Sequence, residues 1–134
     1  MIKKPIQRVI FLVVWFVPLH SAIAEMAEYA SIKQLLIQAI DAPDGKTSGI
    51  LTGNIASFLR KATHSNLPLI ANVTTVGKFS QPGCKRLNIH LSQPGVKTTT
   101  GESENFDVAY GINFCRDGDI PQVGNRFEPL RALN

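Results

Sequence analysis

Apolar residues recur every three or four positions between residues 25 and 65, which is the spacing of a helix face. Residues 25–40 therefore predict a first helix. Its apolar face comprises Tyr29, Ile32, Leu35, Leu36, Ala39 and Ile40. Pro43 and Gly45 break the pattern, because proline disfavours helix at the preceding residue and glycine favours a turn. A second helix is expected after the candidate N-cap Thr52. Its apolar side comprises Leu51, Ile55, Phe58 and Leu59.

Beyond Pro68 the apolar residues alternate with polar ones and many are β-branched, which is typical of strands. Strands are expected at 69–79, 84–92 and 106–115. The first should carry a bulge, because its odd-numbered apolar residues give way to Val76. Between the first two, Gln-Pro-Gly-Cys at 81–84 has the residues that a type II turn prefers. Residues 93–105 are polar and predict a loop, whereas the tail at 116–134 predicts no regular element.

The first 24 residues have the pattern of a secretory signal peptide. Three basic residues precede an eleven-residue apolar run at 9–19, which is too short to span a bilayer as a helix. Ala22 and Ala24 give the Ala-x-Ala spacing of a signal-peptidase site, so cleavage is expected after Ala24. The alternative is an uncleaved anchor. After cleavage no stable membrane insertion is expected.

Removal of this leader leaves residues 25–134, enough for a single α+β domain with a modest core. The leader holds three of the fourteen Lys and Arg residues and none of the ten acidic residues, so the net charge falls from +4 to +1. No run of basic residues remains. Nucleic acid is therefore not an expected partner.

Cys84 and Cys115 are the only cysteines, and export to an oxidising compartment predicts that they form a disulfide. Closing about thirty residues should stabilise the fold by roughly 3 to 4 kcal/mol in the chain-entropy model. The alternatives are a catalytic thiol and a metal ligand. Cys84 and His90 would lie roughly 20 Å apart on an extended strand, which is too far for a thiol and its base. His64 and His90 lack the spacing of a zinc site.

The disulfide and the hydrophobic pattern select the same pairing of the last two predicted strands. If Cys84 faces Cys115 in an antiparallel pair, the numbers of facing residues sum to 199. A one-residue slip would set apolar side chains against polar positions, whereas a diagonal bridge with a two-residue offset stays open. The facing apolar pairs are Leu87 with Ile112, Ile89 with Tyr110, and Leu91 with Val108. The predicted fold is therefore α+β: two N-terminal helices followed by a three-stranded antiparallel β meander stapled by one disulfide.

No motif in the chain specifies a reaction. Gly45-Lys46-Thr47 matches the end of a phosphate-binding loop, but Ile40 occupies the position of the first glycine and a helix precedes it. A turn between two helices is expected there instead. Asp117 and Asp119 lack the further carboxylates of a calcium loop. The chain is not expected to be an enzyme, and no catalytic residue, metal ligand or cofactor is predicted.

The face of the last two strands opposite the apolar pairs is the candidate interaction face. It comprises Arg86, Asn88, His90, Ser92, Asp107 and Asn113. Ala109 and Gly111, which face His90 and Asn88, are small and would leave a shallow polar surface that a partner chain can approach. The alternative is the solvated side of a two-layer domain.

The segments QPGCKRL at 81–87 and FCRDG at 114–118, within the strand pattern of residues 72–118, resemble KikA-like proteins. These are small exported proteins found among conjugation and type IV secretion genes. The resemblance covers about half of the mature chain. It implies a periplasmic accessory of a conjugative or secretion apparatus in a Gram-negative bacterium, and it carries over no catalytic residue.

Two functional hypotheses follow from these features. The first is a non-enzymatic periplasmic or secreted protein that binds a component of a conjugative or type IV secretion apparatus, or of the cell envelope. It would use the candidate interaction face or the polar segment 93–105. The second is a small secreted inhibitor or toxin-like effector that acts on an enzyme or a competing cell. Growth inhibition upon expression without the neighbouring genes would favour the second.

Overall fold

The computed structural model describes residues 25–130, and the predicted signal peptide at 1–24 lies outside these residues. Helix α1 spans Ile32–Asp41 and helix α2 spans Gly53–Thr63. The strands are β1 at Glu28–Tyr29, β2 at Lys46–Leu51, β3 at Leu69–Phe79, β4 at Cys84–Lys97, β5 at Ser103–Cys115 and β6 at Phe127–Pro129.

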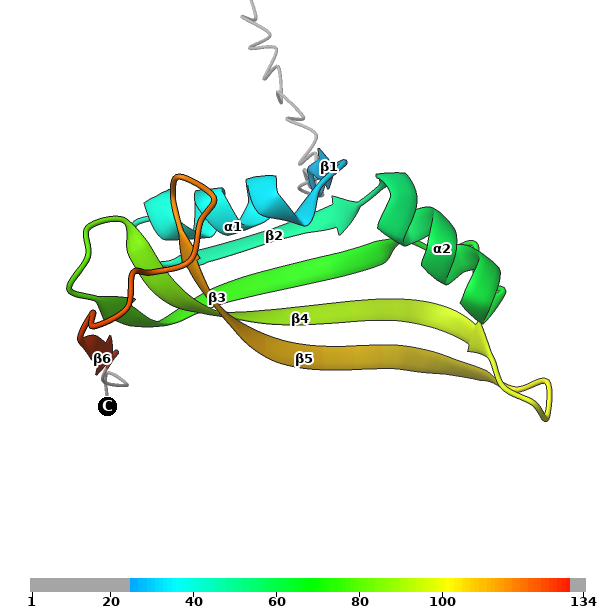
Figure 1. Cartoon of the computed structure of the whole chain (residues 1–134). Helices are drawn as coiled ribbons and strands as arrows, with labels where there is room; N and C mark the ends of the chain where they lie inside the picture. The colour runs from blue at the N-terminus through cyan, green and yellow to red at the C-terminus, as the bar shows by residue number, and fades with distance from the viewer. Residues whose placement is uncertain (1–24, 131–134) are drawn as a thin grey trace, which may run out of the picture.

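The strands form one curved sheet, with α1 lying along it and α2 near the end where β3 begins (Figure 1). The strand order is β1-β2-β3-β4-β5, and β6 pairs separately with β3. β1 and β2 are parallel, whereas every other pair in the described residues is antiparallel. β5 therefore lies at one edge of the sheet and β1 at the other.

The predicted architecture of two helices followed by a three-stranded meander is wrong. The α+β class is confirmed, but the sheet is mixed and has six strands. The main error concerns 46–51, expected as a turn and helix start, which instead forms β2 between the two helices. β2 pairs with β3 from Lys46–Thr74 to Leu51–Leu69, and this pairing, rather than a local pattern, makes the segment extended.

The first helix is shorter than predicted because Ser31 caps it. The Ser31 hydroxyl accepts a hydrogen bond from the Lys33 backbone N–H at 3.2 Å, so the helix begins at Ile32. Tyr29 lies before the cap, on β1, and its ring sits where a Cβ on Gly49 would stand. The rest of the predicted apolar face packs on the sheet, and its buried members are Leu35, Leu36, Ala39 and Ile40.

The predicted register of the last two strands is confirmed. Cys84 faces Cys115, and a disulfide joins them. The apolar pairs Leu87 with Ile112, Ile89 with Tyr110 and Leu91 with Val108 follow in the same register. The bulge near Val76 is confirmed as a register shift between Thr75 and Gly77. Gly83 has a φ of 75°, as a type II turn requires.

The predicted loop at 93–105 is wrong over most of its length. β4 continues to Lys97 and β5 begins at Ser103, so the connection is short. The second Gln-Pro-Gly lies inside β4, where a register shift between Gln93 and Val96 accommodates Pro94 and Gly95. Such an irregularity lets a strand tolerate the residues that locally predict a loop.

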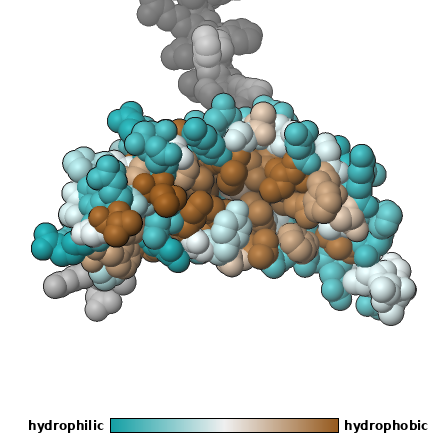
Figure 2. Space-filling view, viewed as in Figure 1, coloured by the Kyte–Doolittle hydropathy of each residue, from teal (hydrophilic) through white to brown (hydrophobic). Residues whose placement is uncertain are grey.

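The helix-covered core reaches only one end of β5. Leu87 is 0 % exposed and belongs to the core that α1 forms with β2, β3, β4 and Phe114 of β5. On the same sheet face, Val108 and Tyr110 of β5 are 38 % and 43 % exposed. Apolar surface gathers across the middle of the molecule in Figure 2. The inward side of β5 is thus only partly covered by the helices.

The predicted apolar side of the second helix is largely wrong. Ile55 and Phe58 are exposed, and Leu59 is only partly buried, whereas Ala56 and Thr63 are buried. Thr52 is the N-cap residue, but its hydroxyl donates to the Tyr29 carbonyl instead of capping the helix. α2 therefore packs through Ala56, Leu59 and Thr63 and leaves Phe58, its largest apolar side chain, in solvent.

The end of α2 is held by the buried side chain of Gln93. The Thr63 hydroxyl donates to Gln93 Oε1 at 2.9 Å, and Gln93 Nε2 donates to the Leu67 carbonyl at 3.3 Å.

We expect Gln93→Leu to lower the free energy of unfolding by about 1 to 3 kcal/mol, because buried polar groups lose their partner. Urea denaturation measures this. Gln34→Leu, at an exposed position of α1, should change it by less than about 0.5 kcal/mol; equal effects would contradict the anchoring role.

Candidate functional site: the polar face of the sheet

The six predicted interaction residues share the sheet face that points away from α1. Arg86, Asn88, His90 and Ser92 alternate along β4, and Asp107 and Asn113 lie on β5. The polar face continues onto β3 and β2, where Ser48 donates to Asn72 Oδ1 at 2.6 Å and Asn72 pairs with His90. Sequence reasoning missed Ser48 and Asn72, although the alternation of polar residues within 69–79 was the available signal for Asn72.

His90 and Asp107 form the central contact of this face. His90 Nε2 lies 3.1 Å from Asp107 Oδ1, and both side chains are about half exposed. His90 faces Ala109 across the strands, so its contact with Asp107 is diagonal. Exposed contacts of this kind contribute about 0 to 1 kcal/mol, so the pair orients side chains more than it stabilises the fold.

Arg86 occupies the space that the small residues of β5 were expected to leave open. Its Nη1 donates to Asn113 Oδ1 at 2.8 Å. Its Nη2 lies only 2.5 Å from the position that a Cβ on Gly111 would take, so the guanidinium crosses β5 directly over this glycine. Within residues 25–130, no carboxylate forms an ion pair with Arg86. The site thus presents a guanidinium that is hydrogen-bonded to an amide and has no carboxylate partner within residues 25–130.

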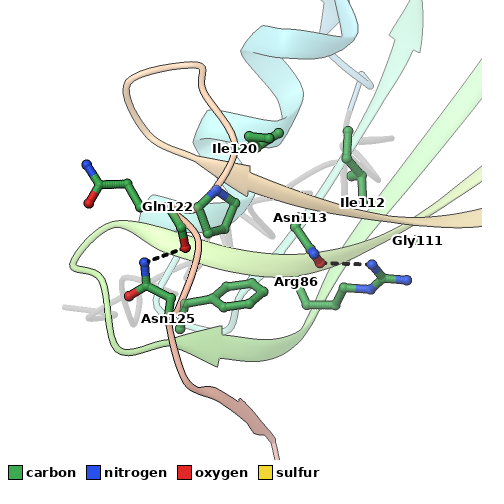
Figure 3. A pocket seen from close by; sticks show the side chains of 9 residues that line it. Arg86, Gly111, Ile112, Asn113, Ile120, Gln122 and Asn125 are labelled. Atoms are coloured by element: carbon green, nitrogen blue, oxygen red, sulfur yellow. Dashed lines mark hydrogen bonds between the residues drawn. The ribbon is translucent and has the colours of Figure 1, made fainter.

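A cavity of about 410 Å³ opens beside Arg86 and Asn113 (Figure 3). Its walls come from β3, β4, β5 and the segment after β5, and they are Phe79, Arg86, Gly111, Ile112, Asn113, Ile120, Pro121, Gln122 and Asn125. The side chain of Gln81 holds the last segment in place, because its Oε1 accepts from the Gln122 N–H and from Asn125 Nδ2, each at 2.8 Å. The cavity combines one cation and several amides with apolar walls.

The disulfide positions the cation of this site. Arg86 and Asn113 face each other across β4 and β5, two residues from Cys84 and Cys115 respectively. Both cysteines are buried, and the Arg116 side chain beyond them forms an ion pair with Asp41 at 3.2 Å. The bridge therefore holds together the ends of the two strands that carry the Arg86–Asn113 contact.

Other chemistry is sparse in the part of the chain that the structure describes. No group of three His, Cys, Asp or Glu residues gathers there as a metal site would require. Neither helix combines the length and the apolar character needed to cross a membrane. Comparison of the chain with protein-family models, with curated proteins and with solved structures gave no match.

Proposed function

We propose that this protein is a non-enzymatic accessory of the periplasm that binds a component of a conjugative or type IV secretion apparatus, or another envelope protein. The observation that carries the proposal is the exposed polar face of β2 to β5 with the cavity beside Arg86. Protein interfaces combine apolar anchor points with a polar surround, and arginine and aromatic residues are enriched in them.

The cavity suits a carboxylate that has an apolar group next to it. Arg86 is the only charged residue in the cavity lining and has no acidic partner in residues 25–130, so an incoming carboxylate would find a free guanidinium edge. Phe79 and Ile120 supply apolar contact beside it. A partner protein would therefore place an Asp, a Glu or a chain terminus with an apolar neighbour here.

Three features support the cellular setting. The leader pattern at 1–24 is that of an exported protein, and the disulfide fits an oxidising compartment. The segments at 81–87 and 114–118 resemble those of KikA-like proteins, which are found among conjugation and type IV secretion genes. Together these features favour a periplasmic partner.

Crosslinking in the periplasm, followed by affinity purification of the tagged protein and mass spectrometry, tests this proposal. We expect enrichment of a secretion or envelope protein over a tagged periplasmic protein of unrelated fold. Asn88→Arg should reduce the recovery roughly tenfold, because it places an unpaired charge at the centre of the polar face.

Gln34→Arg adds the same positive charge at an exposed position of α1 and should leave the recovery of the partner unchanged. The proposal fails if no secretion or envelope protein is enriched. It also fails if both arginine variants reduce the recovery equally.

A further inference from the structure

β5 is a long strand at the edge of the sheet whose outward backbone groups are available for pairing. The Arg116 N–H donates to the Gly83 carbonyl, whereas the Cys115 N–H donates to Asp119, away from β4. Successive residues of a strand direct their backbone groups to opposite sides. The odd-numbered residues, including Asp107, Ala109 and Gly111, therefore direct their N–H and C=O groups toward the free edge.

The side chains of this edge leave it open to another strand. Proteins usually protect edge strands with charged side chains, above all lysine, or with proline, bulges or a covering segment. Asp107 is the one charged residue among residues 106–113. Residues 106–113 contain neither lysine nor proline and pair with β4 without a register shift. Ala109 and Gly111 are small and exposed, and Val108 and Tyr110 on the other face are partly exposed apolar residues.

We propose that β5 pairs in antiparallel fashion with β5 of a second copy of this chain, about a two-fold axis through Ala109. The numbers of facing residues then sum to 218, and the two sheets become one. Asp107 faces Gly111 of the second copy. The guanidinium of Arg86 lies where a side chain at Gly111 would be. Each Asp107, which also contacts His90 of its own chain, therefore meets Arg86 of the other copy, a cation that has an amide partner and no acidic partner in residues 25–130.

Charge and apolar contact favour this register over its neighbours. On the opposite face, Val108 meets Tyr110 of the second copy twice, and such cross-strand apolar pairs stabilise a sheet. A sum of 216 would place the two Asp107 carboxylates diagonally beside each other, where like charges repel. A sum of 220 would move Asp107 from Gly111 to the neutral Asn113. Only the sum of 218 sets Asp107 opposite the residue that Arg86 covers.

The dimer goes beyond the proposed function and does not depend on it, although Asp107 of the second copy and the carboxylate of a partner protein would compete for the same Arg86. A two-fold axis perpendicular to the sheet leaves both polar faces on the same side of the joined sheet. Asn88 lies on β4 and faces Gly111, so Asn88→Arg puts a second cation near Asp107 of the other copy and should still dimerise. Failure to capture a partner protein from the periplasm therefore counts against the proposed function, and failure of the purified chain to dimerise counts against the dimer.

Disulfide crosslinking of Ala109→Cys tests the register. Residues facing each other in a hydrogen-bonded antiparallel pair have Cα atoms about 5.5 Å apart, within the range that a disulfide spans. The two natural cysteines are already paired, so the variant carries one free thiol in the described residues. We expect nearly all of it to run as a covalent dimer on a non-reducing gel after mild oxidation.

Asn105→Cys is the matched control, because it is exposed on the same strand and the same face. In the proposed register the two copies of residue 105 lie roughly 27 Å apart along the strands, so no covalent dimer should form. The register is wrong if Ala109→Cys does not crosslink, or if both variants crosslink equally.

Sedimentation equilibrium tests the pairing without an introduced cysteine. The natural chain should reach the mass of a dimer, and Ala109→Pro should be monomeric, because it removes an outward N–H that has no partner within residues 25–130. Asp107→Arg should weaken the dimer roughly tenfold, and adding Arg86→Asp should restore most of the affinity.

A monomeric natural chain at every soluble concentration overturns the proposal, and a strand from a different protein then becomes the occupant of this edge. Unchanged dimerisation of a folded Ala109→Pro also overturns it. Circular dichroism and a protected disulfide establish that this variant is folded.

Discussion

Replacement of both Cys84 and Cys115 by serine should lower the free energy of unfolding by about 3 to 4 kcal/mol. The disulfide closes a sequence separation of 31 residues, so its loss enlarges the conformational freedom of the unfolded chain. This is a large share of the stability of a chain of this size. Urea denaturation of the mature protein at neutral pH, with and without a reductant, measures the change.

The natural chain in reductant should behave like the double serine variant, and the reductant should not affect that variant. A loss below about 1 kcal/mol in both comparisons would contradict the assigned role of the disulfide. Such a result would mean that the unfolded chain is already restricted without the disulfide, or that strain in the folded state offsets the stabilisation that the disulfide provides.

Leu87→Ala should lower the free energy of unfolding by about 2 to 5 kcal/mol. Leu87 is 0 % exposed and packs in the core under α1, so the variant leaves a cavity. Val108→Ala on the same sheet face should cost less than about 1 kcal/mol, since Val108 on β5 is 38 % exposed. Urea denaturation at low protein concentration compares the two without a contribution from association.

This pair of variants tests where the helix layer ends. A loss for Val108→Ala as large as that for Leu87→Ala would show that β5 is covered in solution. Dependence of the Val108→Ala effect on protein concentration would instead identify a second copy as the cover. The described arrangement predicts a clear difference between the two positions at low concentration.

The correct predictions rest on patterns within an element, or on two patterns that agree with each other. The register of β4 and β5 follows from two cysteine positions and three apolar pairs, and one sum satisfies all of them. The buried face of α1 follows from helical spacing, and the bulge in β3 from a break in the alternation. The helix face and the bulge are read within one element, whereas the register needs the two cysteines to link two strands.

The missed elements depend on pairing with residues far along the chain. β2 has only two adjacent apolar residues, Ile50 and Leu51, and becomes a strand by pairing with β3. β1 and β6 are too short to have a periodicity of their own. Helical spacing puts Phe58 on the apolar side of α2, but the spacing does not show that α2 lies at the end of the sheet, where Phe58 is exposed.

The candidate site was predicted only in part for the same reason. Arg86 and Asn113 follow from the alternation in two strands, but the cavity beside them needs Ile120, Gln122 and Asn125. These residues belong to a tail without local pattern, and its path is held by hydrogen bonds to Gln81. Gln81 lies about forty residues before the segment that its side-chain amide holds, and periodicity cannot reveal such a contact.

The two edges of the sheet differ greatly in length. β5 offers thirteen residues, whereas β1 has only two and leads almost directly into α1. A filament of sheets needs two edges that can each accept a neighbour, and within residues 25–130 only β5 offers a long one. Association in the proposed register is therefore self-terminating, because the β5 edges of both copies are paired once two copies have joined.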